Sequence, residues 1–260
     1  MTTILFVGDI VGRPGRRAVL ELLPGLKKEL APDLVIANGE NLTSGKGFNL
    51  ETITKMRGAG VDFFTTGNHV YANKDALPLL DDPSMPIIRP ANFAGKAPGR
   101  GYQIVQALGK RILIINIISP HATRAVTNSP FEVIDNILAK NSGQYDIAIV
   151  DFHAEFTSDK AVFAWYVDGR VDAVIGTHTH IPTADAHILP KGTTFITDVG
   201  MCGQKWSSLG IDIEPLIRQA TIGLPEKHTI SGGPAVFAAV KITIDGGTRQ
   251  IEQIQDEVGE

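Results

Sequence analysis

Short apolar runs alternate with longer amphipathic stretches along the chain. Most of the runs are rich in Val, Ile and Phe and are bounded by Gly, Asp or Asn, a pattern typical of buried strands. The predicted strands cover residues 4–7, 34–37, 61–65, 112–118, 147–150, 173–175, 194–196 and 236–244.

The stretches between these runs carry apolar residues about four positions apart, which predicts helices. Pro14 lies near the start of the first helix, Asn49 or Glu51 opens the second, and Ser158 is the expected N-cap of another that ends at Gly169. The predicted helices cover residues 16–30, 49 or 51 to 58 or 60, 130–139, 158–169 and 213–220.

Strand–helix alternation predicts an α/β fold in which mostly parallel or mixed sheets are flanked by helices. The end of the chain departs from this alternation, because residues 235–244 and 250–254 flank Asp245-Gly246-Gly247 and predict a closing β-hairpin. We identify no linker, repeat or low-complexity segment, so we expect residues 1–260 to form a single domain.

Polar groups that can bind a metal follow five of the predicted strands. In open α/β sheets, sites assemble where the carboxyl ends of the strands meet, so we expect these groups to share one rim. The candidates are Asp9, Glu40, Asn41, Asn68, His69, His153, His178 and His180.

Taken alone, most of these residues have an ordinary structural explanation. Asp9 could cap a helix or shape a turn, Asn68 could be a turn residue, and His153 could be a buried structural histidine. His178 and His180 are more specific, because alternate residues of an extended segment point to one side. Five such strand ends together favour a metal site over coincidence by roughly ten to one.

The ligand types restrict the metal. Carboxylate, amide and imidazole groups without a thiolate suit manganese, iron, zinc or cobalt. The eight candidate groups exceed the needs of one tetrahedral zinc ion, and two metals about 3.5–4 Å apart with a bridging carboxylate would use them all. We therefore expect two transition-metal ions per chain.

Composition narrows the class of protein further. The chain of 260 residues carries 24 Lys and Arg against 28 Asp and Glu, and it contains one cysteine, Cys202. A single cysteine excludes an intrachain disulfide framework and a Cys-based zinc site, and the absence of a basic block argues against long duplex nucleic acid. The longest apolar run, 112–118, is too short to cross a bilayer, and the N-terminus lacks the features of a signal peptide. We expect a cytoplasmic protein that engages no membrane, with homo-oligomerisation left open.

The ordered motifs resemble those of the calcineurin-like metallophosphoesterase superfamily. Within it, the chain most resembles the YmdB-like family of small bacterial cyclic-nucleotide phosphodiesterases over nearly its whole length. The segments that carry this closer resemblance are Gly8-Asp9-Ile10-Val11-Gly12, Asn38-Gly39-Glu40-Asn41, Arg89-Pro90-Ala91-Asn92-Phe93, Asp151-Phe152-His153-Ala154-Glu155 and Leu189-Pro190-Lys191-Gly192-Thr193.

Two departures from the general superfamily pattern affect the first metal position. Val11 stands where an Asp-x-His motif has its histidine, and Glu40 stands where an aspartate usually bridges the metals. Asn41 can replace the histidine with an oxygen ligand, which makes the site harder and favours iron or manganese, with zinc, cobalt or magnesium as alternatives.

The resemblance implies a layered α/β sandwich and a division of roles among the candidate residues. It implies that Glu40 bridges the two metals and that His69 stays unligated as the proton donor. The remaining ligands are then Asp9, Asn41 and His180 on one metal, and Asn68, His153 and His178 on the other.

The function expected on this basis is hydrolysis of small cyclic nucleotides of the 2′,3′-cyclic type. A hydroxide held between the metals would attack phosphorus, and His69 would protonate the departing alkoxide. A net positive site suits a small anionic phosphodiester or nucleotide. Two alternatives stay open: a phosphomonoesterase such as a nucleotidase, and a regulatory protein that binds metals without catalysis.

Two further features are open at this point. Residues 43–47 follow the Glu40 motif and could lie at the mouth of the pocket, although an ordinary loop is the favoured explanation because the segment lacks the ending and spacing of a phosphate-binding loop. Asp198 could support a ligating histidine from behind or simply shape a turn.

Overall fold

The structure, a computed structural model, describes residues 1–230 and 232–259. Its helices are α1 (Gly12–Leu30), α2 (Leu50–Ala59), α3 (Ala76–Asp81), α4 (Pro130–Lys140), α5 (Thr157–Val167) and α6 (Ile213–Ile222). Its strands are β1 (Thr2–Val7), β2 (Asp9–Ile10), β3 (Leu34–Asn38), β4 (Phe63–Thr65), β5 (Tyr102–Ala107), β6 (Lys110–Ile118), β7 (Ile147–His153), β8 (Ala173–Thr177), β9 (His187–Ile188), β10 (Thr194–Ile196), β11 (Met201–Gln204), β12 (Ala235–Asp245) and β13 (Thr248–Val258).

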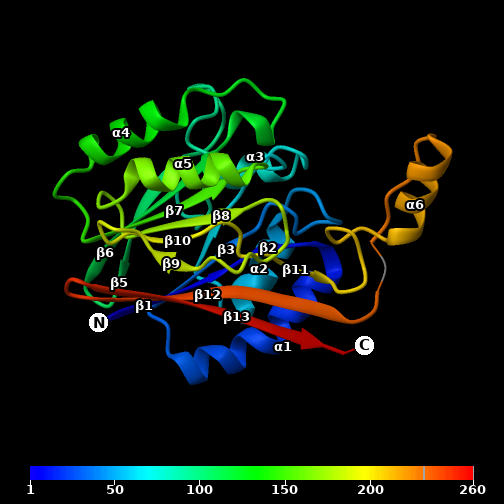
Figure 1. Cartoon of the computed structure of the whole chain (residues 1–260), viewed down its shortest axis with the longest axis horizontal. Coiled ribbons are helices and arrows are strands. Elements are labelled where there is room, and N and C mark those ends of the chain that lie inside the picture. Colours follow the sequence, from blue (N-terminus) through cyan, green and yellow to red (C-terminus); the bar gives the residue numbers. More distant parts are fainter. Residues whose placement is uncertain (231, 260) are drawn as a thin grey trace.

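Two sheets pack face to face, with helices on the outer face of each (Figure 1). The first has seven strands in the order β2-β11-β12-β1-β3-β4, with β13 beside β12. The second has six strands in the order β5-β6-β7-β8-β10-β9. Helices α1 and α2 cover the first sheet, while α4 and α5 cover the second. The α/β layered sandwich expected from the sequence is confirmed.

Alternating side chains explain why both faces of the central strands are apolar. On β1, Ile4 and Phe6 enter the layer between the sheets, whereas Leu5 and Val7 pack under α1. Strands buried on both faces need apolar residues at nearly every position. The nearly continuous runs in the sequence are therefore the strands that lie deepest.

The direction of the strands gathers polar residues at one edge. Strands β1, β3 and β4 are parallel neighbours in the first sheet, and β6, β7, β8 and β10 are parallel neighbours in the second. Asn38 at the end of β3 donates from its Nδ2 to Asp151 Oδ2 of β7 at 3.0 Å, which ties the two sheets together at this edge. The site described below is built there.

The structure corrects several predicted elements. Helix α1 starts at Gly12 rather than at residue 16, and β4 starts only at Phe63. Helix α5 has Phe156 as its N-cap, so Ser158 lies inside the first turn and caps nothing. Strands β5 and β11 were not predicted, because a half-buried edge strand and the short Met201–Gln204 segment lack a run of β-branched residues.

The segment between β11 and β12 forms an arm that carries α6 away from the two sheets (Figure 1). None of the ten residues of α6, all of which the structure describes, is buried. Among the described residues, no helix is both long and apolar enough to span a membrane.

Candidate metal centre

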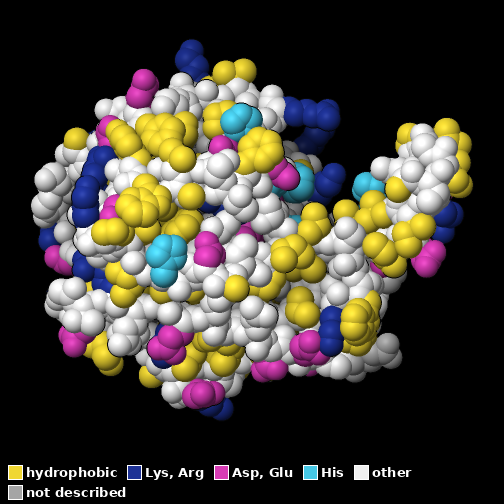
Figure 2. All heavy atoms as spheres, in the orientation of Figure 1, with side chains coloured by type: hydrophobic (Ala, Val, Ile, Leu, Met, Phe, Trp, Pro, Cys, Tyr) yellow, Lys and Arg dark blue, Asp and Glu magenta, His cyan; other side chains and the backbone are white. Residues whose placement is uncertain are grey.

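The carboxyl ends of the strands bring all eight predicted site residues into one network. Asp9, Glu40 and His153 are fully buried, and the cluster opens into a hollow beside the arm (Figure 2). The short strand β2 holds Asp9 by pairing with β11, and His153 is the last residue of β7. The remaining members follow β3, β4 and β8 and are Glu40, Asn41, Asn68, His69, His178 and His180.

Glycines let the backbone come close enough to form the cluster. A Cβ added at Gly67 would lie 2.3 Å from His153 Nε2 and 2.4 Å from Glu40 Oε2. A Cβ at Gly176 would lie 1.7 Å from the carbonyl oxygen of Thr197. No side chain fits at either position, so these glycines are required by close packing around the site.

Glu40 lies at the centre of the network. Asn41 Nδ2 donates to its Oε1 at 3.0 Å, the backbone N–H of His69 donates to its Oε2 at 3.1 Å, and His153 Nε2 lies 3.3 Å from Oε1. Burial would raise the pKa of Glu40, but the charge and hydrogen bond of His153 outweigh it and hold this pKa below its usual range. The carboxylate is thus ionised and faces both sheets.

A buried relay orients His153. Its Nδ1 lies 2.9 Å from Thr177 Oγ1, and Thr177 Oγ1 donates to Asp151 Oδ1 at 2.6 Å. Because the hydroxyl proton goes to Asp151, the hydroxyl oxygen is left to accept from His153 Nδ1. The Nε2 of His153 therefore faces the cluster, 2.9 Å from Asn68 Oδ1 and 3.3 Å from Glu40 Oε1.

The outer nitrogens of His178 and His180 are also held by acceptors. His178 Nε2 lies 2.8 Å from Glu155 Oε2, and His180 Nδ1 lies 3.0 Å from the carbonyl oxygen of Leu209. Histidine ligands of metals usually give their second N–H to such an acceptor, which fixes the tautomer and the ring. Each of the three histidines thus turns its other ring nitrogen toward the cluster.

Both histidines have left-handed backbone conformations, with φ of 99° at His178 and 64° at His180. Such strain persists only where the surroundings enforce it. Here Asp198 accepts from Thr179 N at 3.0 Å and from Thr179 Oγ1 at 2.7 Å, and buried Lys160 pairs with the same carboxylate at 2.6 Å. Asp198 therefore holds the turn between the two histidines from behind.

Electrostatics favour a cation at the centre. Burial alone would lower the pKa of His153, but the charge of Glu40 overcomes it and raises this pKa to about 9. Burial raises the pKa of Asp9 to about 7, and burial together with His153 lowers that of His178 to about 3. In the described part of the chain, Asp9 Oδ1 is buried without a hydrogen-bond partner, 3.8 Å from His180 Nε2.

The donor atoms fall into two groups that share one carboxylate. Ligand atoms of Glu40, His153 and His178 lie within 4.8 Å of one another, and so do those of Asp9, Glu40 and His180. The orphaned oxygen of Asp9, the shared glutamate and the absence of thiolate from both groups fit divalent metal ions.

Asn41 fits this arrangement less directly. Its Nδ2 faces Glu40 Oε1 and lies 3.3 Å from His180 Nε2, while its Oδ1 lies 2.8 Å from His69 Nδ1. A half-turn of the amide exchanges the nitrogen and the oxygen without moving the backbone, and only the turned form offers an oxygen to a metal.

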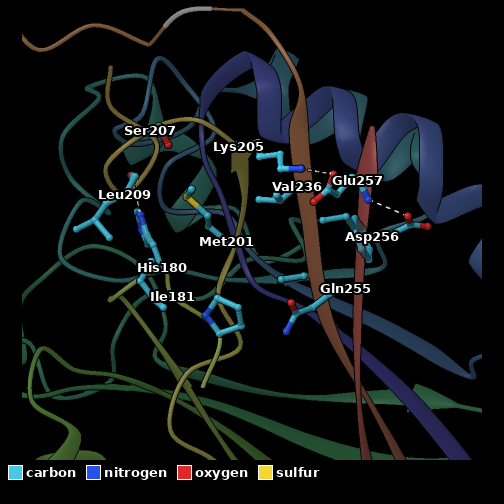
Figure 3. Close-up of a pocket in the computed structure, with 13 residues that line it drawn as sticks. His180, Ile181, Met201, Lys205, Ser207, Leu209, Val236, Gln255, Asp256 and Glu257 are labelled. Atoms are coloured by element: carbon cyan, nitrogen blue, oxygen red, sulfur yellow. Dashed lines mark hydrogen bonds and ion pairs between the residues drawn. The ribbon is translucent and has the colours of Figure 1, made fainter. Parts of the chain in front are cut away.

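The cavity above the cluster has a volume of about 260 Å³. His69 lines it, and burial lowers the pKa of this imidazole below its usual value. Gly45 and Lys46 also line it, so the loop at residues 43–47 does lie at the pocket mouth. His180 and Leu209 separate this cavity from a second one of about 370 Å³ between the base of the arm and strands β12 and β13 (Figure 3).

Sequence reasoning missed four groups that hold the cluster: Thr177, Asp151, Glu155 and the carbonyl of Leu209. Asp151 had a detectable signal, because it lies two residues before His153 and alternate residues of a strand share a face. No signal in the sequence indicated Leu209, since it contacts His180 through its backbone carbonyl from 29 positions away and every residue type has that carbonyl.

Comparison with known proteins places these observations in a family. A family model described as YmdB-like protein matches residues 5–256. The chain is 41% identical over 253 residues to the 2′,3′-cyclic-nucleotide 2′-phosphodiesterase of Bacillus subtilis, covering 97% of this chain and 95% of that protein.

Two crystal structures share the fold closely. A hypothetical protein from Thermus thermophilus superposes with a TM-score of 0.93 at 37% identity, covering 98% of this chain and 99% of that one. A novel phosphatase from Mycoplasma pneumoniae superposes with a TM-score of 0.91 at 34% identity, covering 99% and 93%.

Proposed function

The chain belongs to the YmdB-like protein family and is a metal-dependent phosphoesterase, and from that premise we propose that it hydrolyses small cyclic phosphodiesters of the 2′,3′-cyclic nucleotide type. The observation that carries the proposal is the pair of ligand groups that share Glu40, one with two histidines and the other with one, all three anchored from outside the cluster. The Bacillus subtilis relative named for this activity supports the substrate class.

We assign the two groups to two metal ions. The oxygen-rich donor set favours iron or manganese, with zinc, cobalt or magnesium as alternatives. When bound, the ions neutralise charge on the phosphoryl oxygens and supply water of lowered pKa. Glu40 would bridge them, with Asp9, Asn41 and His180 on one and Asn68, His153 and His178 on the other.

His69 supplies the proton for the departing oxygen. Its Nδ1 lies 3.7 Å from Glu40 Oε1, so the carboxylate favours the protonated ring against the burial that lowers the pKa of His69. Within the described residues Nε2 makes no hydrogen bond, which leaves that atom free to donate. An alkoxide is a poor leaving group, and a positioned acid is worth about 10²–10⁴ in rate.

The remaining features of the pocket suit a small anionic substrate. Lys46 adds a positive charge at the mouth, and a cavity of about 260 Å³ suits a mononucleotide better than a long duplex. The apolar layer between the sheets is continuous, so we also propose that residues 1–260 form one domain. A cytoplasmic location and self-association stay predictions.

A phosphomonoesterase is the second candidate, favoured by the Mycoplasma pneumoniae relative described as a phosphatase. Both activities would use the same ligands. They differ in whether the substrate phosphorus carries one ester bond or two, and an assay separates them directly.

The test combines metal analysis with paired substrates. The protein is reconstituted with manganese or iron, its metal content is measured, and hydrolysis of 2′,3′-cyclic AMP is compared with that of 3′-AMP. We expect close to two metals per chain and faster turnover of the cyclic diester. One metal or fewer would overturn the dinuclear centre, and preference for the monoester would make the protein a nucleotidase. Full metal loading without turnover of either would favour a regulatory role.

A further inference from the structure

The cavity above the metal centre has two unlike sides. One side carries the carboxylates, amides and imidazoles of the cluster. The other is apolar and consists of Val11, Leu209, Ile211 and Ile230. Binding metal ions requires none of these four side chains, so the apolar side calls for a different explanation.

Most of this apolar side belongs to the arm. Leu209 and Ile211 lie in the loop that enters α6, and Ile230 lies on the segment that returns to β12. We call Leu209, Ile211 and Ile230 the arm wall. The arm thus closes one side of the cavity, although its helix stands away from the sheets (Figure 1).

The entering loop is built as a fixed turn. Ser207 Oγ donates to the carbonyl of Gln204 at 2.6 Å and accepts from Gly210 N at 3.0 Å. Ser208 and Ile211 exchange two backbone hydrogen bonds of 2.8 and 2.9 Å. The carbonyl of Leu209 also holds His180 Nδ1, which fixes the position of the arm wall relative to the metal centre.

Ile230 packs closely against two glycines beside the cavity. A Cβ added at Gly45 would lie 2.5 Å from Ile230 Cδ1, and one at Gly12 would lie 3.2 Å from the same atom. The isoleucine therefore packs onto two glycines. A wall held on both flanks in this way is formed before any ligand arrives.

The chemistry of the wall limits what it can recognise. The side chains of Leu209, Ile211 and Ile230 carry no hydrogen-bond donor or acceptor, and the Leu209 carbonyl is occupied by His180. Such a surface can contact the flat face of an aromatic ring, which gains from burial of apolar area. It cannot read the hydrogen-bonding edge that distinguishes one nucleobase from another.

We propose that Ile211 and Ile230 bind the face of the substrate nucleobase while the phosphate lies over the metal centre. This inference rests on the proposed phosphodiesterase function and adds that the enzyme accepts purine and pyrimidine nucleotides alike. The arm is thus a substrate-binding element, and its two isoleucines determine affinity for nucleotides over phosphodiesters that lack a base.

The test compares substrates with and without a base. The variant I211A/I230A and the wild type are assayed with 2′,3′-cyclic AMP, 2′,3′-cyclic CMP and methyl riboside 2′,3′-cyclic phosphate. Loss of apolar contact in a binding pocket changes specificity by about 10-fold or more. We expect KM for both nucleotides to rise roughly 10-fold, with kcat, metal content and the rate on the riboside unchanged.

The matched control is Ile217→Ala, which removes an isoleucine of the same arm that does not line the cavity and is 48% exposed. It should leave all three substrates unaffected. Equal losses on nucleotides and riboside, or no loss at all, would overturn the role of the wall. More than about 10-fold preference of the wild type for one base would overturn contact through the face alone.

A binding measurement separates this inference from the proposed function. Calorimetry of the metal-loaded protein with 3′-AMP and ribose 3-phosphate as probes requires no turnover. If the wild type binds the nucleotide more tightly and the double variant does not, the wall binds a base even where no diester is hydrolysed. If both proteins bind the two probes equally, the inference fails whatever the reaction proves to be.

Discussion

The cavity has two contrasting parts: the metal-binding cluster, which we call the floor, and the arm wall. On the floor, Glu40 and His153 are fully buried, and their polar atoms are held by directional contacts to neighbouring side chains. On the wall, Ile211 and Ile230 are partly exposed and offer only apolar contact, next to a helix with no buried residue. Chemistry needs fixed charges and lone pairs, and a low-dielectric setting strengthens their interactions. Contact with varied ligands needs only shape and apolar area.

The largest effect should follow from breaking the centre of the floor. Glu40→Gln removes the carboxylate shared by both ligand groups, so both metals should weaken together and turnover should be lost. Substituting a residue that supports a metal ligand from behind typically lowers metal affinity about 10–100-fold, and substituting a ligand shared by two metals should lower it further. Metal titration followed by the diester assay measures this, with exposed Glu51→Gln as the control. A Glu40 variant that still binds two metals tightly would show that Glu40 does not bridge them.

The next prediction separates binding from proton transfer on the same floor. His69→Ala should leave metal content unchanged and lower kcat by about 10²–10⁴, with a smaller loss for p-nitrophenyl esters, whose leaving group departs without a proton. Burial lowers the pKa of His69, so the acid form is depleted as pH rises and wild-type activity should fall on the alkaline side. This fall in activity at alkaline pH should be absent from the His69 variant.

Exposed His121→Ala is the control, and neither rate nor pH profile should change in it. Loss of a metal from the His69 variant would make this residue a ligand. An equal loss of rate on good and poor leaving groups would show that His69 does not donate the proton.

A third prediction concerns the support beneath the floor. Lys160 and Asp198 form a fully buried ion pair at 2.6 Å, and Lys160→Met leaves the carboxylate without its counter-ion. Breaking one partner of a buried pair costs about 3–5 kcal/mol, so the free energy of unfolding should fall by that amount in denaturant titration. Lys241→Met breaks the more exposed pair with Glu252 and should cost less than about 1 kcal/mol. Similar losses in both variants would contradict a special role for the buried pair.

A smaller effect is expected from the relay behind His153. Thr177→Val removes the hydroxyl that accepts from His153 Nδ1 and donates to Asp151, so the ring loses its fixed orientation. Metal affinity should fall about 10–100-fold. Thr194→Val removes a buried hydroxyl that donates to the backbone of Asp172 near the amino end of β8, and it should leave metal affinity unchanged. A Thr177 variant with wild-type affinity would show that the relay is dispensable.

The smallest effect is expected on the arm helix. Ile217 is 48% exposed, so Ile217→Ser should change the free energy of unfolding by no more than about 0.5 kcal/mol. Thermal or urea unfolding measures this. A loss above about 2 kcal/mol, or one that depends on protein concentration, would mean that the arm helix is covered in solution and that the contrast between floor and wall is overstated.

The fold class followed from local pattern. Strand β1 is buried on both faces and apolar from Ile4 to Val7, and the residues that follow it are free to be polar. The same rule indicated Asp9, Glu40 and His153, because each stands where an apolar run stops and a site-forming edge begins. Strand β5 escaped prediction because it lies half-buried at an edge, where the apolar pattern weakens.

The sequence by itself therefore determined the layers and the candidate residues of the metal centre, since both depend on residue type and on neighbours within one strand. Only the tertiary structure decided what surrounds them. Leu209 meets His180 through a backbone oxygen, and Ile230 meets Gly45 across 185 positions of chain. Contacts of this kind depend on how the arm folds back over the sheets, and that path is set by packing between distant segments rather than by any local period.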